Sequence, residues 1–93
     1  MPEIHFLVRW PDGSVQRCYS PSTVVEVYLV AGQDYALTEF VDRATEALTI
    51  ADARVREKYG FGCGRAVALS AELRERAADL AGDARVLVEG FER

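Results

Sequence analysis

The two cysteines, Cys18 and Cys63, are the residues of this 93-residue chain that could do the most varied chemistry. They lie far apart in the sequence, so the close Cys-x-x-Cys spacing of redox and zinc sites is absent. Each precedes a predicted helix, and a helix N-terminus lowers a thiol pKa and makes the thiol a better nucleophile or redox sensor. The alternative, which we favour, is that both are small apolar fillers, because free cysteine is among the most buried residue types.

The densest cluster of polar side chains is the sequence CYSPST at residues 18–23. Its hydroxyl groups, together with the free N–H groups of a helix start, could bind a phosphate or a carboxylate. The segment lacks the lysine and the glycines of a phosphate-binding loop, so capping of the helix by the hydroxyl groups is the favoured interpretation. The candidate ligand-binding residues are Cys18, Tyr19, Ser20, Ser22, Thr23 and Cys63.

No complete catalytic or metal-binding set accompanies these residues. His5 is the single histidine, and one imidazole defines neither a triad nor a zinc site. Asp42 and Glu46 lie on the polar face of a predicted helix, where charges are normally solvated. We therefore expect no catalytic residue, no metal and no cofactor, and we expect that the protein is not an enzyme.

The first elements that would position these residues form a β-hairpin. Apolar and polar residues alternate over residues 3–10, which is typical of a strand. The sequence Pro-Asp-Gly at 11–13 predicts a tight turn, and residues 15–19 predict the returning strand. The apolar positions of the first strand are Ile4, Phe6, Val8 and Trp10.

Three helices and a last strand follow. Ser20 to Thr23 predict the start of a helix that ends near Ala31, with a strand as the alternative because the segment is rich in valine. Apolar residues spaced by three and four predict a long helix over residues 37–59. Residues 65–81 predict another helix, and residues 85–91 predict a strand. The inward positions expected on the helix over 65–81 are Val67, Leu69, Leu73, Ala77 and Leu80.

This element order, ββαααβ, predicts an α+β fold of two layers in a single domain over residues 1–93. An isolated hairpin is marginally stable, so the last strand should complete a three-stranded sheet. We place the first strand between the second and the last (order 2-1-3), with the helices over one face. The aromatic and glycine residues at 59–62 predict a corner that could line a small pocket or contact a partner.

Composition narrows the classes of function. Eleven basic and 15 acidic residues give a net charge of −4, which argues against a nucleic-acid-binding protein. No apolar run is long enough to span a membrane, and the first ten residues do not have the pattern of a signal peptide. With cysteines that show no disulfide pattern, these features predict a cytoplasmic protein without a membrane partner.

Three segments carry a family resemblance: PEIHFLVRWPDG at residues 2–13, CYSPSTVVEVYL at 18–29 and ADARVREKYGFGC at 51–63. They resemble a family of small bacterial proteins named for the nitrogen-starvation response. The resemblance implies genes that neighbour those of a radical-SAM protein, an N-acyltransferase, a nitrilase-like hydrolase and a flavoprotein. It implies an accessory role beside such enzymes and brings no catalytic activity with it.

We therefore expect a small non-catalytic accessory protein that binds a protein partner or associates with itself. Trp10 and Tyr28 are the candidate interface residues, and the valine-rich segment 24–30 and an exposed sheet edge are the candidate contact surfaces. The alternative is a small-molecule or anion-binding module, which could depend on a thiol, at the helix start over Cys18 to Thr23.

Overall fold

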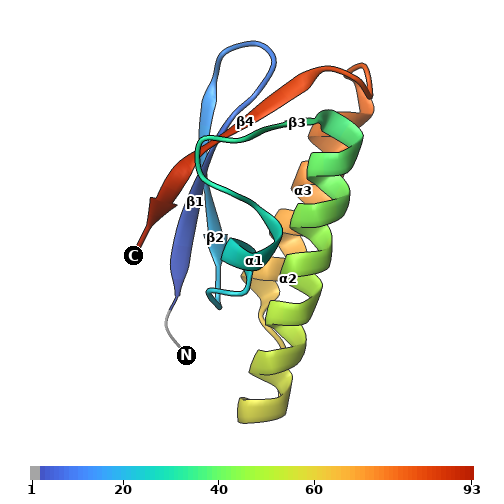
Figure 1. The fold of residues 1–93 in the computed structure, drawn as a ribbon. Coiled ribbons are helices and arrows are strands. Elements are labelled where there is room, and N and C mark those ends of the chain that lie inside the picture. Colours follow the sequence, from blue (N-terminus) through green and yellow to red (C-terminus); the bar gives the residue numbers. More distant parts are fainter. Residues whose placement is uncertain (1–2) are drawn as a thin grey trace.

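The helices of this chain lie on one side of a four-stranded antiparallel sheet, as a computed structural model that describes residues 3–93 shows (Figure 1). The expected α+β class is confirmed. The elements in chain order are β1 (Ile4–Arg9), β2 (Val15–Ser20), α1 (Val25–Tyr28), β3 (Asp34–Ala36), α2 (Leu37–Tyr59), α3 (Gly64–Ala78) and β4 (Arg85–Glu92).

The strands are ordered β2-β1-β4-β3, so the first strand lies between the second and the last, as expected. The prediction of three strands is wrong, because β3 adds a fourth at the edge beside β4. The pairing of Tyr35 with Val86 places it there. A strand of three residues is too short to show an alternating pattern, so periodicity could not reveal it.

The β1–β2 hairpin closes through the predicted Pro-Asp-Gly turn. Gly13 has a φ of 88°, which favours glycine, and the Asp12 carboxylate accepts the Ser14 backbone N–H at 2.9 Å. The Trp10 N–H donates to the Ser14 carbonyl at 2.8 Å, and the Gly13 N–H donates to the Trp10 carbonyl. This pattern is a turn followed by a glycine bulge, and it fixes the register that pairs Arg9 with Val15.

The first helix is much shorter than expected. The prediction of a helix from Ser20 to Ala31 is wrong, because Ser20 is the last residue of β2 and α1 is a single turn over Val25–Tyr28. Branched valines disfavour a helix, and the segment beyond α1 turns to form β3. The helix expected over 65–81 begins at Gly64 and ends at Ala78, whereas the bounds of α2 agree with the prediction.

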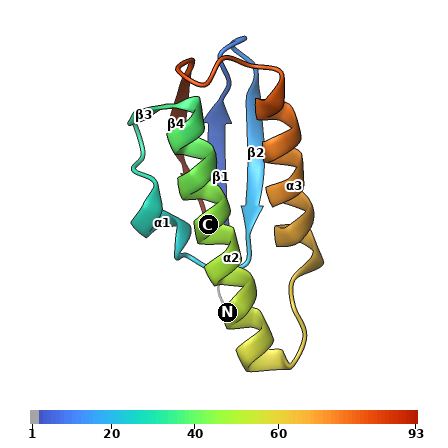
Figure 2. The same cartoon turned by 90° about the vertical axis from the view of Figure 1, so that its right-hand side faces the viewer.

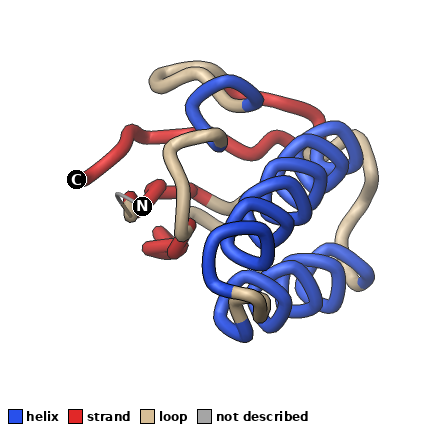
Figure 3. Tube along the Cα trace, turned by 90° about the horizontal axis from the view of Figure 1, so that it is seen from below, coloured by secondary structure: helices blue, strands red, loops and turns tan. Residues whose placement is uncertain are grey.

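The core lies between the sheet and the pair α2 and α3. α2 crosses the sheet and α3 runs beside it next to β2 (Figures 2 and 3). The inward face of β1 is buried as expected, and the Trp10 ring meets the Phe40 ring edge to face at 5.8 Å between centroids. Val67 and Leu80 were expected inward, but both are exposed.

The last turns of α2 continue beyond the end of the sheet (Figures 1 and 2). Tyr59, the last residue of α2, is therefore 50% exposed. Among residues 3–93, no helix combines the length and the apolar character that crossing a bilayer requires.

We expect Phe40→Ala to lower the free energy of unfolding by about 3 to 5 kcal/mol, because it opens a cavity against Trp10 in the core. Phe61→Ala is the matched control, since that ring is 69% exposed, and its effect should stay within about 0.5 kcal/mol. Urea denaturation followed by tryptophan fluorescence measures both. Equal losses for the two variants would contradict this description of the core.

Candidate functional site

Cys18 is fully buried in the core. Removal from water raises the pKa of its thiol to about 12, with a further increase from the Glu72 carboxylate and an opposing effect of the Arg76 guanidinium. The thiol therefore stays protonated and out of reach of solutes. This position supports the interpretation of Cys18 as an apolar filler rather than as a nucleophile.

The serines of the CYSPST segment are also used inside the protein. Ser20 Oγ donates to the Ser22 carbonyl at 2.6 Å, and Ser22 Oγ accepts the Val24 N–H at 3.3 Å. Both residues are buried and close the turn between β2 and α1, and α1 has no side-chain cap. The expected helix-start site over Cys18 to Thr23 is therefore not assembled, and of its residues only Tyr19 and Thr23 are partly exposed.

Two of the six candidate residues, Tyr19 and Cys63, do come together. They line a surface hollow of about 330 Å³, which we call the aromatic hollow, where β2 meets the connection between α2 and α3. Burial raises the pKa of the Tyr19 phenol, with smaller contributions from Glu3 and from Cys63, so this hydroxyl stays protonated at neutral pH. The lining residues are Tyr19, Pro21, Val55, Tyr59, Phe61, Gly62 and Cys63.

The connection that carries Phe61 is held by backbone geometry. Gly60 ends α2 with a φ of 82°, and its N–H donates to the Arg56 carbonyl at 2.8 Å. Phe61 then lies with its ring 6.4 Å from the ring of Tyr59. The aromatic corner that the sequence indicated at residues 59–62 therefore lines a surface hollow.

Asp52 ties this connection back to α2. Its Oδ1 accepts the Cys63 N–H at 2.6 Å and its Oδ2 accepts Arg56 Nε at 3.1 Å. The Cys63 N–H, followed by the Arg56 side chain, lowers the pKa of the Asp52 carboxyl. A side chain at Gly62 would begin 2.5 Å from Asp52 Oδ1, so the Asp52 carboxylate would have to move and its hydrogen bond to the Cys63 N–H would be disturbed.

The surroundings of the aromatic hollow are basic, although the chain is acidic. Residues 52–65 contain four basic and two acidic side chains, so they carry +2 and the rest of the chain carries −6. The Arg65 guanidinium lies 3.7 Å from the centroid of the Tyr19 ring, and Lys58 Nζ lies 5.5 Å from that of Tyr59. We call Arg56, Lys58 and Arg65, which lie beside residues that line the hollow, the basic rim.

The two predicted interface residues differ in position. Trp10 is 2% exposed, its Nε1 donates to Gln16 Oε1 at 2.9 Å, and the Arg76 guanidinium covers its ring at 4.5 Å. It is a core residue that leaves almost no surface for a partner. Tyr28 is partly buried against the core beside the exposed Val27 and Val30.

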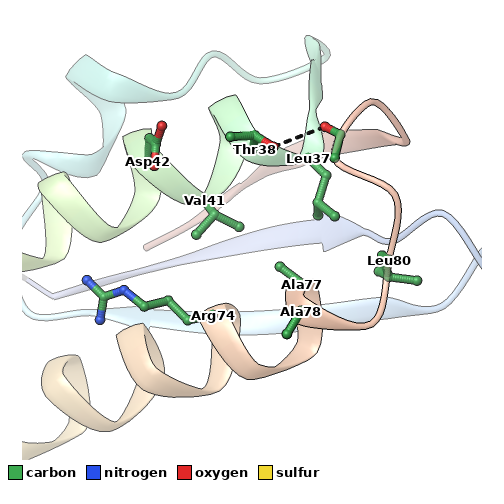
Figure 4. A pocket seen from close by; sticks show the side chains of 9 residues that line it. Leu37, Thr38, Val41, Asp42, Arg74, Ala77, Ala78 and Leu80 are labelled. Carbon is green, nitrogen blue, oxygen red and sulfur yellow. Dashed lines mark hydrogen bonds between the residues drawn. The ribbon is translucent and has the colours of Figure 1, made fainter.

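A second hollow of about 260 Å³ lies between the start of α2 and the end of α3 (Figure 4). Its walls are mainly apolar, from Leu37, Val41 and Ala77. Asp42 and Arg74 lie at its rim, and neither side chain points toward the apolar walls in Figure 4. A small-molecule site normally places a few convergent polar groups in an apolar pocket, so this hollow fits such a site poorly.

Metal ligands do not gather in residues 3–93, where no three histidine, cysteine or acidic side chains lie close enough to hold an ion. His5 instead packs edge to face against Tyr19, with 5.7 Å between the ring centroids.

Comparison with known proteins links the chain to one family. The family model described as "Nitrogen starvation-induced protein NitG" matches residues 5–91. Comparison with curated proteins found no match, and comparison with solved structures found none either.

We expect the folded protein at pH 8 to react with a thiol reagent at Cys63 alone, because Cys18 is buried and its thiol has a pKa of about 12. Labelling of Cys18 should require unfolding in urea. Mass spectrometry after tryptic digestion identifies the modified cysteine, and Cys63→Ala should abolish the fast reaction. Labelling of both cysteines at one rate in the folded protein would contradict the burial of Cys18.

We expect Asp52→Ala to destabilise the protein by about 1 to 2 kcal/mol at pH 7, because a charged acceptor is removed from the Cys63 N–H. The folded-state pKa of Asp52 is lowered, so its contribution is present above pH 3.8 and is lost as the pH falls through the folded-state pKa. The difference between the two proteins in urea denaturation should therefore shrink below pH 3.8. A difference that is constant from pH 7 to pH 2.5 would rule out the charged acceptor as its cause.

Proposed function

The chain belongs to the nitrogen starvation-induced protein NitG family, and we propose that it is a non-catalytic accessory protein that binds another protein in the response to nitrogen starvation. The partner in this proposal is one of the enzymes whose genes we expect, from the family resemblance, to neighbour the gene of this protein. The contact surface is the aromatic hollow with its basic rim.

The observation that carries the proposal is the exposure of two aromatic side chains at one place. Tyr59 is 50% exposed and Phe61 is 69% exposed, and they border the same hollow. Aromatic side chains held at the surface are the commonest anchors of protein interfaces. The hydrogen bonds of Gly60 and Asp52 hold their backbone in place before a partner arrives, which reduces the entropy cost of binding.

The remaining chemistry of the chain supports a binding role rather than catalysis. The Cys18 thiol is protonated and buried, and the hydroxyls of Ser20 and Ser22 take part in local hydrogen bonds. These groups serve the fold, whereas Tyr59 and Phe61 contribute less to the core than their size would allow.

The aromatic hollow also gives the alternative, a small-molecule-binding module, its best location. Its volume of about 330 Å³ lies at the lower end of the range for small-molecule pockets. Such pockets enclose most of their ligand, however, and the exposure of Tyr59 and Phe61 leaves this hollow open. We therefore prefer a macromolecular partner, whose own surface would cover the two rings.

A photo-crosslinking phenylalanine analogue at position 61 tests the proposal in nitrogen-starved cells. We expect one specific protein adduct at position 61 and none at position 27, where the 80% exposed Val27 is the matched control on α1. With the captured protein purified, Phe61→Ala should weaken binding at least about 30-fold, because loss of an interface anchor costs about 2 kcal/mol or more.

Position 27 lies in the valine-rich segment 24–30, the other candidate contact surface, so the comparison distinguishes the two surfaces. Equal adducts at positions 27 and 61, or unchanged affinity of the Phe61→Ala variant, would reject this surface. The stability measurement on Phe61→Ala described above ensures that a loss of affinity is not a loss of fold.

A further inference from the structure

The long edge of the sheet is open along β2. β3 forms the other edge and has only three residues, whereas β2 has six and pairs with β1 alone. An open edge presents unpaired backbone N–H and C=O groups, to which an extended chain can bind as an added strand. β2 is thus the edge of this sheet that has the length to accept one.

The hairpin register shows which backbone groups point outward. Trp10 bonds to the Ser14 carbonyl, and bonded pairs alternate with non-bonded pairs along an antiparallel hairpin. Gln16 and Cys18 therefore direct their backbone groups toward β1. Val15, Arg17 and Tyr19 direct theirs away from the sheet.

A groove accompanies this edge. β2 and α3 border a hollow of about 460 Å³, with Gln16 and Glu72 at one end and Tyr19 and Arg65 at the other. Figure 2 shows α3 running alongside β2. Tyr19 also lines the aromatic hollow, so the two hollows adjoin at this side chain.

The charges favour a partner strand of acidic character. The basic rim lies beyond the Tyr19 end, and within residues 3–93 Arg65 and Lys58 form no salt bridge with a carboxylate. A second copy of β2 fits less well, because antiparallel pairing centred on Arg17 would place two arginines opposite each other. Glu72 at the far end of the groove, and Glu3 beside the Tyr19 phenol, limit the acidic requirement to the part of the segment that lies next to Arg65 and Lys58.

We propose that an extended, acidic segment of the partner protein binds as a fifth strand along β2 and inserts an apolar side chain into the aromatic hollow. The inference rests on the proposed function, since it describes how the same surface takes its partner. Backbone hydrogen bonds at Val15, Arg17 and Tyr19 give affinity, and the aromatic hollow and the basic rim select the sequence.

A capped peptide of alternating glutamate and valine that ends in phenylalanine tests this mode by NMR with the 15N-labelled chain. We expect it to shift the amide signals of Val15, Arg17 and Tyr19 and to slow their hydrogen exchange at least tenfold. Replacing its glutamates by lysine should weaken binding at least tenfold. Only every second backbone N–H of the bound peptide would face β2. N-methylation of those peptide residues should therefore abolish binding, whereas N-methylation of the residues between them should be tolerated.

Variants of the protein test the charge separately. Arg65→Glu should weaken binding of the acidic peptide at least tenfold. Arg74→Glu should leave binding of the acidic peptide unchanged. Arg74 is an exposed residue on the same helix, α3, and it lines the hollow between α2 and α3 rather than the groove beside β2. Folding of both variants is read from the same spectra.

The inference would be overturned if the acidic peptide did not bind or if the lysine peptide bound equally well. It would also be overturned if peptides N-methylated on either set of alternate residues bound normally, or if the protein alone formed a dimer with protected β2 amides. Shifts confined to residues 59–63 would also reject the added strand but leave the proposed function standing. The crosslink at position 61 tests that function without reference to β2, so the two can fail separately.

Discussion

The burial of one face of β1 against the helices is the interaction on which the rest of the structure depends. Ile4, Phe6 and Val8 are fully buried, and β1 is hydrogen-bonded to a neighbour on each side. Because paired residues of neighbouring strands share a face, the inward side of β1 dictates the inward side of β2. Cys18 pairs with Phe6 and Ser20 with Ile4, so the packing of β1 decides that neither can meet a ligand.

The features of the fold that could be predicted are those with long, regular patterns. β1 shows a full alternation and α2 shows apolar residues at helical spacing over 23 residues, so both were recognised. The last strand was expected to join the hairpin because an isolated hairpin is only marginally stable, an argument that does not select its neighbour in the sheet. β3 and α1 were not predicted correctly, because three or four residues hold barely more than one repeat of a strand or helix pattern, and their conformations depend on contacts with β4 and α2.

The candidate site shows a different limit on what can be predicted from the sequence. The residues of CYSPST are adjacent in sequence, yet alternation along β2 sends Cys18 and Ser20 into the core and leaves Tyr19 at the surface. The meeting of Tyr19 with Cys63 arises from the packing of α3 beside β2, which no local pattern in the sequence reports. The aromatic corner after α2 could be recognised, because two aromatic residues interrupted by glycines at a helix end have a local signal, but its nearness to β2 could not.

The exposed end of α2 follows from a mismatch in length between the helix and the sheet. A helix of 23 residues is about 34 Å long, whereas a strand of six residues spans only about 20 Å. The sheet therefore cannot cover the last turns of α2, and these turns depend on local interactions such as the Asp52 carboxylate and the Gly60 cap. A helix trimmed to the sheet would not expose an aromatic side chain at its end. The additional turns instead carry Tyr59 and Phe61 past the core to the place where β2 ends, so the length of α2 creates the surface that we assign to a partner.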